Sequence, residues 1–278
     1  MANNRKPKGR PATKEEKRQM AREKARILRE QEEKRKKRNR FLAIAGGVVV
    51  LALVVFAVLQ ILGKDSGGQE YEGTARPAEL ANVADDYGIN IGASGAAGET
   101  VADAGVLSVF SDYTCSGCIN LENKYSQQYR TLMNEGKLSL RLYPVATLGN
   151  HISDNMTAAM YYVATYAPAQ ALDFNEALFA ETNGVVFGGN RGPDAKGIAD
   201  IAAKVGVPAD VVADMPASIT SEAWQKVAVD ATESFRAKGH QYTPTLEVNG
   251  VADNSWAEEG GSVDAVIQRV VDEGAPGK

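Results

Sequence analysis

The feature that most constrains the fold is a pair of cysteines, placed where an expected strand ends and an expected helix begins. The chain of 278 residues contains two cysteines, Cys115 and Cys118, separated by two residues. Residues 106–110 before them are mostly β-branched or aromatic, which favours a strand. After them, residues recur at intervals of three and four along one helical face, namely Cys118, Leu121, Tyr125, Tyr129 and Leu132. We therefore expect Cys115 at a helix start and Cys118 one turn inside the helix.

This position predicts reactive thiols. The first-turn amides of a helix lack intrahelical partners and carry about half a positive charge, which favours a thiolate over a thiol. We predict that substrate thiols attack the exposed Cys115 of the oxidised pair, and that Cys118 is the leaving and later resolving thiol. A purely structural disulfide is the first alternative, but it would close a very small loop and gain little from chain entropy. A zinc site needs about four ligands, and His151 and His240 are remote in sequence, so we expect no metal and no cofactor.

The charge of the chain is divided by a long apolar segment. Residues 1–40 contain 17 Lys and Arg against 6 Glu, whereas the remaining residues contain 14 basic and 29 acidic side chains. Residues 41–59 have no charged or polar side chain, and residues 60–62 extend them to a length that crosses a hydrocarbon core of roughly 30 Å. A buried core helix and a cleaved signal peptide are the alternatives. The forty-residue basic region before the segment, with no A-x-A site soon after it, favours a retained signal anchor.

The positive-inside rule then assigns the parts of the chain to compartments. We predict a basic cytoplasmic tail over residues 1–40, a transmembrane signal anchor over 41–62, an extracytoplasmic linker over 63–86 and an extracytoplasmic domain over 87–278. We therefore expect a single-pass protein of the cell membrane, with its thiol pair in an oxidising compartment. The basic tail is expected to act as a topology signal and to contact lipid headgroups. It has no aromatic interleaving or recognition motif that would favour nucleic acid.

The remaining elements follow from hydrophobic periodicity and turn residues. Leu138, Leu140 and Leu142 alternate with polar residues, which predicts a strand ended by Pro144. Asn249-Gly250 predicts a hairpin between two short strands. The other expected elements are a short helix in 77–86, a short strand in 89–103, four helices between 151 and 239 and a final helix after Ser262. This is the element order of a thioredoxin fold with an all-helical insertion.

Two segments carry a resemblance to a known family. Residues 110–118, Phe-Ser-Asp-Tyr-Thr-Cys-Ser-Gly-Cys, resemble the active-site segment of DsbA-type thiol–disulfide oxidoreductases. Residues 243–250, Thr-Pro-Thr-Leu-Glu-Val-Asn-Gly, resemble the cis-proline hairpin of that family. The resemblance covers about residues 87–275 and implies an α/β thioredoxin fold with an all-helical insertion at about 150–239. It implies a membrane-tethered protein of the Gram-positive, particularly actinobacterial, type.

The same resemblance implies a function and its partners. Such proteins introduce disulfides into reduced secreted or surface proteins, and a quinone-linked membrane oxidase of the vitamin K epoxide reductase type commonly reoxidises them. It also implies a cis bond before Pro244, which turns the backbone of Thr243 toward the cysteines to pair with an extended substrate. An ordinary trans proline at a strand start is the alternative. A disulfide reductase or isomerase of the same fold, or a non-catalytic binding ectodomain on a membrane anchor, are the alternative functions.

The residues between and around the cysteines depart from the strongly oxidising members. Ser116-Gly117 stands where those members commonly carry Pro-His, so we expect a less stabilised Cys115 thiolate and a less oxidising disulfide. The Ser116 hydroxyl remains as a donor. Asp112 is a candidate acceptor, through water, of the Cys118 proton, and otherwise shapes the turn. His240 is a candidate substitute for the missing imidazole across the cleft, and otherwise a surface histidine.

Overall fold

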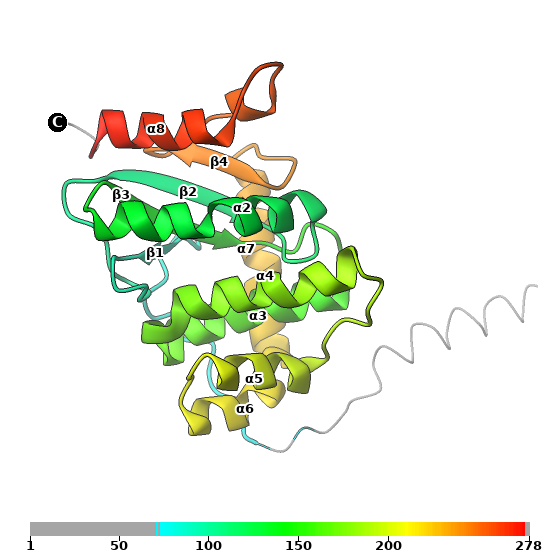
Figure 1. Cartoon of the computed structure of the whole chain (residues 1–278). Coiled ribbons are helices and arrows are strands. Elements are labelled where there is room, and N and C mark those ends of the chain that lie inside the picture. The colour runs from blue at the N-terminus through cyan, green and yellow to red at the C-terminus, as the bar shows by residue number, and fades with distance from the viewer. Residues whose placement is uncertain (1–70, 72, 276–278) are drawn as a thin grey trace, which may run out of the picture. The chain divides into compact units, whose positions relative to one another are not determined.

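The computed structural model describes residue 71 and residues 73–275. The predicted basic tail and transmembrane anchor lie outside these residues, as does the first part of the predicted linker. Within them, a β-sheet is surrounded by helices (Figure 1). None of the helices in this part of the chain is both long enough and apolar enough to cross a bilayer.

The sheet has five strands in the order β1-β3-β2-β4-β5. The central strands β2 and β3 run parallel, and every other neighbouring pair runs antiparallel. The strands are β1 (Ile89–Ile91), β2 (Gly105–Ser111), β3 (Leu138–Pro144), β4 (Thr245–Val248) and β5 (Val251–Ala252). Asn249 and Gly250 join β4 to β5 with φ angles of 51° and 83°, as a two-residue hairpin turn requires. The predicted hairpin is therefore confirmed.

The helices of the described residues follow the predicted order. Five of them, α3 to α7, lie between β3 and β4, in the region where an all-helical insertion was predicted. The helices are α2 (Ser116–Asn134), α3 (His151–Tyr166), α4 (Ala171–Val186), α5 (Ala195–Lys204), α6 (Ala209–Ile219), α7 (Glu222–Ala237) and α8 (Val263–Glu273), with short 3-10 helices at Pro168–Gln170 and Ser255–Ala257.

Alternation along the central strands divides the core between the two faces of the sheet. Leu107 and Val109 of β2 and the three predicted leucines of β3 belong to the main core, together with the buried faces of α2 and α8. Phe110 of β2 and Tyr143 of β3 face the other side, where their rings stack 4.0 Å apart. Phe235 of α7 packs there, 5.7 Å from the Phe110 ring. Both faces of β2 are thus covered, which fixes the direction of the strand that leads to the cysteines.

Residues 77–86 do not form the short helix that we predicted. Several backbone carbonyls in this stretch, including that of Arg76, accept hydrogen bonds from side chains of the helical insertion. The Trp224 indole donates to the Arg76 carbonyl at 2.8 Å, and the Tyr166 hydroxyl donates to the Pro77 carbonyl at 2.6 Å. Arg76 also forms ion pairs with Asp210 and Asp214. This part of the predicted linker therefore packs on the helical insertion.

Helix α6 was not predicted. Pro216 lies inside the helix and interrupts its periodic pattern, which favours a break, whereas Pro208 is the N-cap residue. Tertiary packing outweighs this preference, because Met215 and Ile219 are buried in the main core. The Tyr162 hydroxyl of α3 also donates to the Val211 carbonyl at 2.9 Å and holds α6 against α3.

Candidate active site

The two cysteines lie at the junction of β2 and α2. Cys115 is the N-cap residue of α2, with extended backbone angles (φ −81°, ψ 121°), and Cys118 lies in the first turn of the helix. Cys115 is partly exposed, whereas Cys118 is 1% exposed, and both are free thiols. The structure therefore presents one sulfur to solvent and keeps the other inside, as the helical position predicted.

The surroundings of Cys115 stabilise its thiolate. They lower the pKa of Cys115 from 9.0 to about 5, first through the hydrogen bond from the Cys118 thiol. Partial burial opposes this effect, while the Thr243 side chain and the backbone N–H groups of Cys118 and Gly117 add to it. These amides belong to the start of α2, where backbone donors lack intrahelical partners. Cys115 is therefore largely a thiolate at neutral pH.

The surroundings of Cys118 have the opposite effect. Burial raises the pKa of Cys118 well above 9.0, and the adjacent Cys115 sulfur raises it further. The backbone N–H of Asp112 and the Thr243 side chain oppose the rise. The reduced pair thus holds one negative charge, on the outer sulfur, and one proton, on the inner sulfur.

The loop before β4 forms the opposite wall of the site. The Thr243–Pro244 peptide bond is cis, as the resemblance implied. In the thiol form, Cys115 Sγ donates to the Thr243 carbonyl oxygen at 3.3 Å. A Cβ atom added to Gly117 would lie 3.1 Å from Pro244 Cδ, a tight contact for any side chain. Gly117 therefore allows the turn between the cysteines to lie directly against this loop.

Asp112 joins the cysteine turn to the loop that follows β3. It is fully buried, and its carboxylate accepts hydrogen bonds from the Thr114 backbone N–H (2.9 Å) and hydroxyl (2.9 Å). It also accepts hydrogen bonds from the Leu148 backbone N–H (3.0 Å) and the Thr147 hydroxyl (3.3 Å). Thr147 Oγ1 is in turn 3.4 Å from Thr243 Oγ1. The predicted turn-shaping role of Asp112 agrees with these contacts.

The remaining candidate modulators differ in position. Ser116 is exposed as the first residue of α2. His240 points its Nε2 atom at Glu247 Oε1, 2.9 Å away, and its ring packs 4.7 Å from Phe110. The histidine is thus engaged in the smaller core under α7 rather than exposed as a surface residue. Within the described residues, no three His, Cys, Asp or Glu side chains are grouped as a metal site requires.

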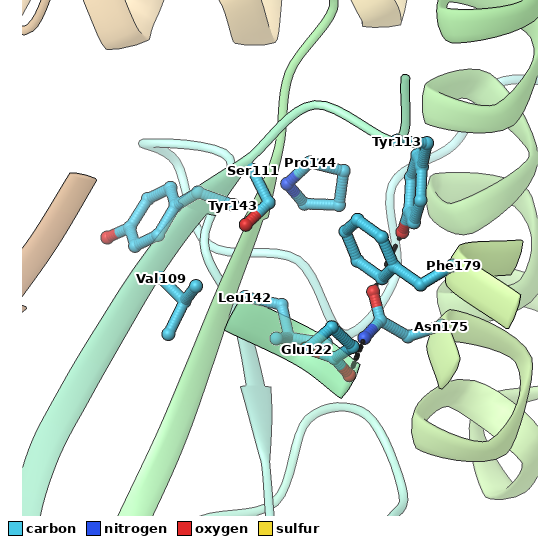
Figure 2. Close-up of a pocket in the computed structure, with 9 residues that line it drawn as sticks. All are labelled: Val109, Ser111, Tyr113, Glu122, Leu142, Tyr143, Pro144, Asn175 and Phe179. Carbon is cyan, nitrogen blue, oxygen red and sulfur yellow. Dashed lines mark hydrogen bonds between the residues drawn. The ribbon is translucent and has the colours of Figure 1, made fainter. Parts of the chain in front are cut away.

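A second buried carboxyl lies one turn after Cys118, and the sequence reasoning missed it. Glu122 Oε1 accepts a hydrogen bond from Asn175 Nδ2 at 3.0 Å, and Asn175 Oδ1 accepts one from the Tyr113 hydroxyl at 2.9 Å. Figure 2 shows these three hydrogen-bonded side chains, which line a small cavity. The volume of the cavity is about 10 Å³, the space of one water molecule. A charged residue on the apolar face of α2, four positions after Cys118, was the available signal.

Comparison with known proteins identifies the family. The family model described as thioredoxin matches residues 92–264, which include both cysteines and the cis-proline loop. The chain belongs to the thioredoxin family. No curated protein matches this thioredoxin-family chain. The predicted fold class, a thioredoxin fold with added helices, is confirmed.

Solved structures place this thioredoxin-family protein beside thiol–disulfide oxidoreductases. It is similar to MdbA of Actinomyces oris, a thiol–disulfide oxidoreductase, with 25% identity and a TM-score of 0.60 over 73% of this chain and 93% of that one. MdbA of Corynebacterium diphtheriae shares the fold, with 16% identity and a TM-score of 0.54 over 73% and 96% of the chains. DsbA of Mycobacterium tuberculosis in its oxidised form also shares it, with 21% identity and a TM-score of 0.52 over 68% and 95%. The predicted DsbA-like thiol–disulfide oxidoreductase is confirmed.

Thr243 provides a test of how the site holds its charge. We expect Thr243→Val to raise the pH midpoint of Cys115 ionisation, about 5 in the native protein, by roughly one pH unit. The substitution removes the hydroxyl that favours the thiolate and leaves the backbone carbonyl in place. Ultraviolet absorbance of the thiolate against pH measures the midpoint. Thr165→Val is the matched control, since that hydroxyl donates to the Tyr161 carbonyl within α3. An unchanged midpoint in Thr243→Val would show that the Thr243 hydroxyl does not stabilise the Cys115 thiolate.

Proposed function

We propose that this protein is a thiol oxidase that introduces disulfides into reduced secreted or surface proteins by exchange at Cys115 and Cys118. The observation that carries the proposal is the difference between the two sulfurs: Cys115 is stabilised as a thiolate and Cys118 as a thiol. The stabilised Cys115 thiolate, to which the Cys118 thiol donates, favours the reduced pair relative to its disulfide. A disulfide whose reduced form is stabilised is a stronger oxidant.

The exchange proceeds in two steps. A substrate thiolate attacks Cys115 Sγ, the Cys115–Cys118 bond breaks, and Cys118 leaves with the electron pair and then takes up a proton. A second substrate thiolate attacks the substrate sulfur of the mixed disulfide, forming the substrate disulfide and releasing Cys115 as a thiolate. Two electrons pass from the substrate to the enzyme. The Thr243 carbonyl, 3.3 Å from Cys115 Sγ, is positioned to accept a hydrogen bond from the substrate backbone.

The pKa of Cys115 indicates the strength of this oxidant. A value of about 5 lies between about 3.5 for the reactive cysteine of DsbA and about 7 for that of thioredoxin. We therefore expect a reduction potential between about −270 and −120 mV. The Ser116-Gly117 pair supports an intermediate value because it adds no imidazole beside the thiolate.

The compartment and the redox partner form part of the proposal. Residues 41–62 act as a signal anchor, the basic residues 1–40 stay in the cytoplasm, and the catalytic domain faces outward. The apolar segment and the charge asymmetry of the sequence support this arrangement. A membrane oxidase of the vitamin K epoxide reductase type would then remove the electrons from the reduced pair. The similarity to the thiol–disulfide oxidoreductase MdbA of Actinomyces oris supports the exchange chemistry on which this arrangement depends.

Two exposed apolar side chains border the site and are suited to hold an unfolded substrate. Leu148 is 55% exposed and its backbone N–H bonds to Asp112, while Tyr242 is 77% exposed and precedes Thr243. We expect Leu148→Ser and Tyr242→Ser each to raise KM for a reduced protein substrate by about tenfold, because each removes roughly 1–2 kcal/mol of apolar contact. The value of kcat should stay within about twofold. Val229→Ser is the matched control, since Val229 is 53% exposed on α7. An equal KM change in that control would contradict the assignment.

The proposed function is tested by combining a rate with a potential. The full chain is mixed with a reduced, unfolded secreted protein, and the formation of native disulfides is followed. The reduction potential is measured by equilibration with glutathione buffers. Faster disulfide formation and a potential well above about −270 mV support the oxidase. A potential near −270 mV indicates a reductase, and an absence of exchange indicates a binding ectodomain.

A further inference from the structure

The loop before β4 brings Thr243 to the cysteines but has no regular structure of its own. Residues 238–244 lie between α7 and β4, and Gln241 and Tyr242 within them are exposed. Even so, the Thr243 carbonyl oxygen lies 3.3 Å from Cys115 Sγ. An exposed loop keeps one position only where packing and hydrogen bonds fix it, so the contacts on either side of Thr243 decide where it lies.

His240 fixes the start of this loop to the sheet. Its Nε2 atom lies 2.9 Å from Glu247 Oε1 of β4, and both side chains are more than nine-tenths buried. A carboxylate only accepts hydrogen bonds, so the imidazole N–H is the donor. The centroid of the ring lies 4.7 Å from that of Phe110 on β2 and 5.3 Å from that of Phe235 on α7. His240 therefore contacts both strands that lead into the walls of the site.

A second bond fixes the loop nearer to Thr243. Thr245 Oγ1 at the start of β4 donates to the Tyr242 carbonyl at 2.6 Å. The loop is thus attached to β4 at two points, by His240 and by Tyr242. The attachment by His240 resists displacement, because moving the ring away would leave the Glu247 carboxylate buried without this donor.

We propose that His240 and Glu247 are positioning residues that hold Thr243 against Cys115, an inference that rests on the exchange reaction of the proposed function. The imidazole points at Glu247, so it serves the site through the loop instead of donating to the thiolate directly. Its effect passes through Thr243, whose side chain favours the Cys115 thiolate and whose carbonyl is positioned to pair with the substrate backbone. A group that is held in place before the substrate arrives does not have to be ordered during the reaction.

Two variants break the bond from its two ends. His240→Phe keeps an aromatic ring against Phe110 and removes the donor, whereas Glu247→Leu removes the acceptor. In the reduced full chain, we expect each to raise the pH midpoint of Cys115 ionisation, about 5 in the native protein, by about half a pH unit or more. The value of kcat/KM for a reduced protein substrate should fall about tenfold. His240→Gln places an amide donor near the position of Nε2 and should restore the native midpoint.

A double-mutant cycle shows whether the effect passes through Thr243. In a Thr243→Val background the hydroxyl that His240 positions is already absent, so adding His240→Phe should move the midpoint by less than about 0.2 pH units. A shift as large as in the native background would mean that His240 acts on Cys115 by another route, and the inference would be wrong. His151→Phe is the matched control, since His151 is an exposed histidine at the start of α3 and its loss should leave the midpoint unchanged.

The combined variant His240→Phe/Glu247→Leu separates positioning from packing and from loss of the fold. It removes both polar groups, so it should unfold in urea like the native protein even where a single variant, with one buried group unpaired, does not fold. We expect it to keep a raised midpoint, because the bond that fixes the loop is absent. A native midpoint in this folded variant would show that the pair only fills space and would overturn the inference. The midpoints do not depend on turnover, so a native chain that oxidises no substrate would overturn the proposed function alone.

Discussion

Cys118→Ala is expected to stop turnover and to accumulate disulfide adducts between Cys115 and its substrates. The variant keeps the exposed sulfur that attacks or is attacked, but it lacks the thiol that resolves the mixed disulfide. Turnover should fall by about 10³-fold or more, as for other members of a catalytic unit. The adducts appear as high-mass species on a gel and disappear when a reductant is added.

The same variant also tests the electrostatics of the pair. The Cys118 thiol is the main donor that lowers the pKa of Cys115, so its removal should move the ionisation of Cys115 to higher pH. The Thr243 hydroxyl and the backbone donors remain, so the midpoint should stay below 9.0. Alkylation rates of the reduced variant across pH measure this midpoint.

Cys115→Ala is the matched control. It removes the entry sulfur, leaves Cys118 buried, and should give neither turnover nor adducts. Adducts on Cys118 in this variant would contradict the assigned order of attack. Native thermal unfolding in both variants would show that the losses come from chemistry and not from the fold.

Much of the fold followed from local patterns. The alternation of Leu138, Leu140 and Leu142 and the Asn249-Gly250 turn are short-range signals, and the structure forms the strand and the hairpin they predict. The four predicted helices of the insertion are present because their apolar spacing matches the buried face of each. Local signals failed where distant partners decide the outcome. Trp224 and Tyr166 capture the backbone of Arg76 and Pro77, and α6 forms despite Pro216.

The site was predictable to the extent that it lies on contiguous segments. Cys115 and Cys118 were found from their spacing, and Thr243 and Pro244 from a family resemblance, since 128 positions separate Cys115 from Thr243. Glu122 was missed because its partner Asn175 comes from the helical insertion, 53 positions away. His240 was expected either across the cleft from the cysteines or at the surface. In the folded protein it instead contacts Glu247 and packs against Phe110, and these contacts cannot be read from the local sequence. Periodicity predicts which face of an element is buried, but it does not predict which polar groups meet there.

Glu122→Gln is expected to make the reduced protein more stable at pH 8 by about 2–4 kcal/mol. In the native fold the pKa of Glu122 is about 8, above its value of 4.5 in an unfolded chain. The folded state therefore binds more protons than the unfolded state between these values. The contribution of Glu122 to the stability of the folded state is complete below about pH 4.5, decreases as the pH rises, and is lost above about pH 8. The total change is roughly 4–5 kcal/mol at most, since each pH unit corresponds to about 1.4 kcal/mol.

Glutamine removes this slope because it does not ionise, and its amide oxygen can still accept the hydrogen bond from Asn175 Nδ2. Its amide N–H₂ group must be buried in turn, which costs about 1–2 kcal/mol and accounts for the smaller expected gain. Urea unfolding of both proteins at pH 5, 6.5 and 8, with reductant present, gives the difference directly. Ionisation elsewhere in the fold is common to both proteins and cancels in that difference.

Glu135→Gln provides the control, since Glu135 is an exposed partner of Lys137 at the end of the same helix. Its effect should stay within about 0.5 kcal/mol at each pH. If the native protein and Glu122→Gln differ by the same amount at pH 5 and pH 8, Glu122 does not titrate between them. If the difference grows with pH as expected, this chain carries at neutral pH a buried carboxyl that glutamine would replace with greater stability.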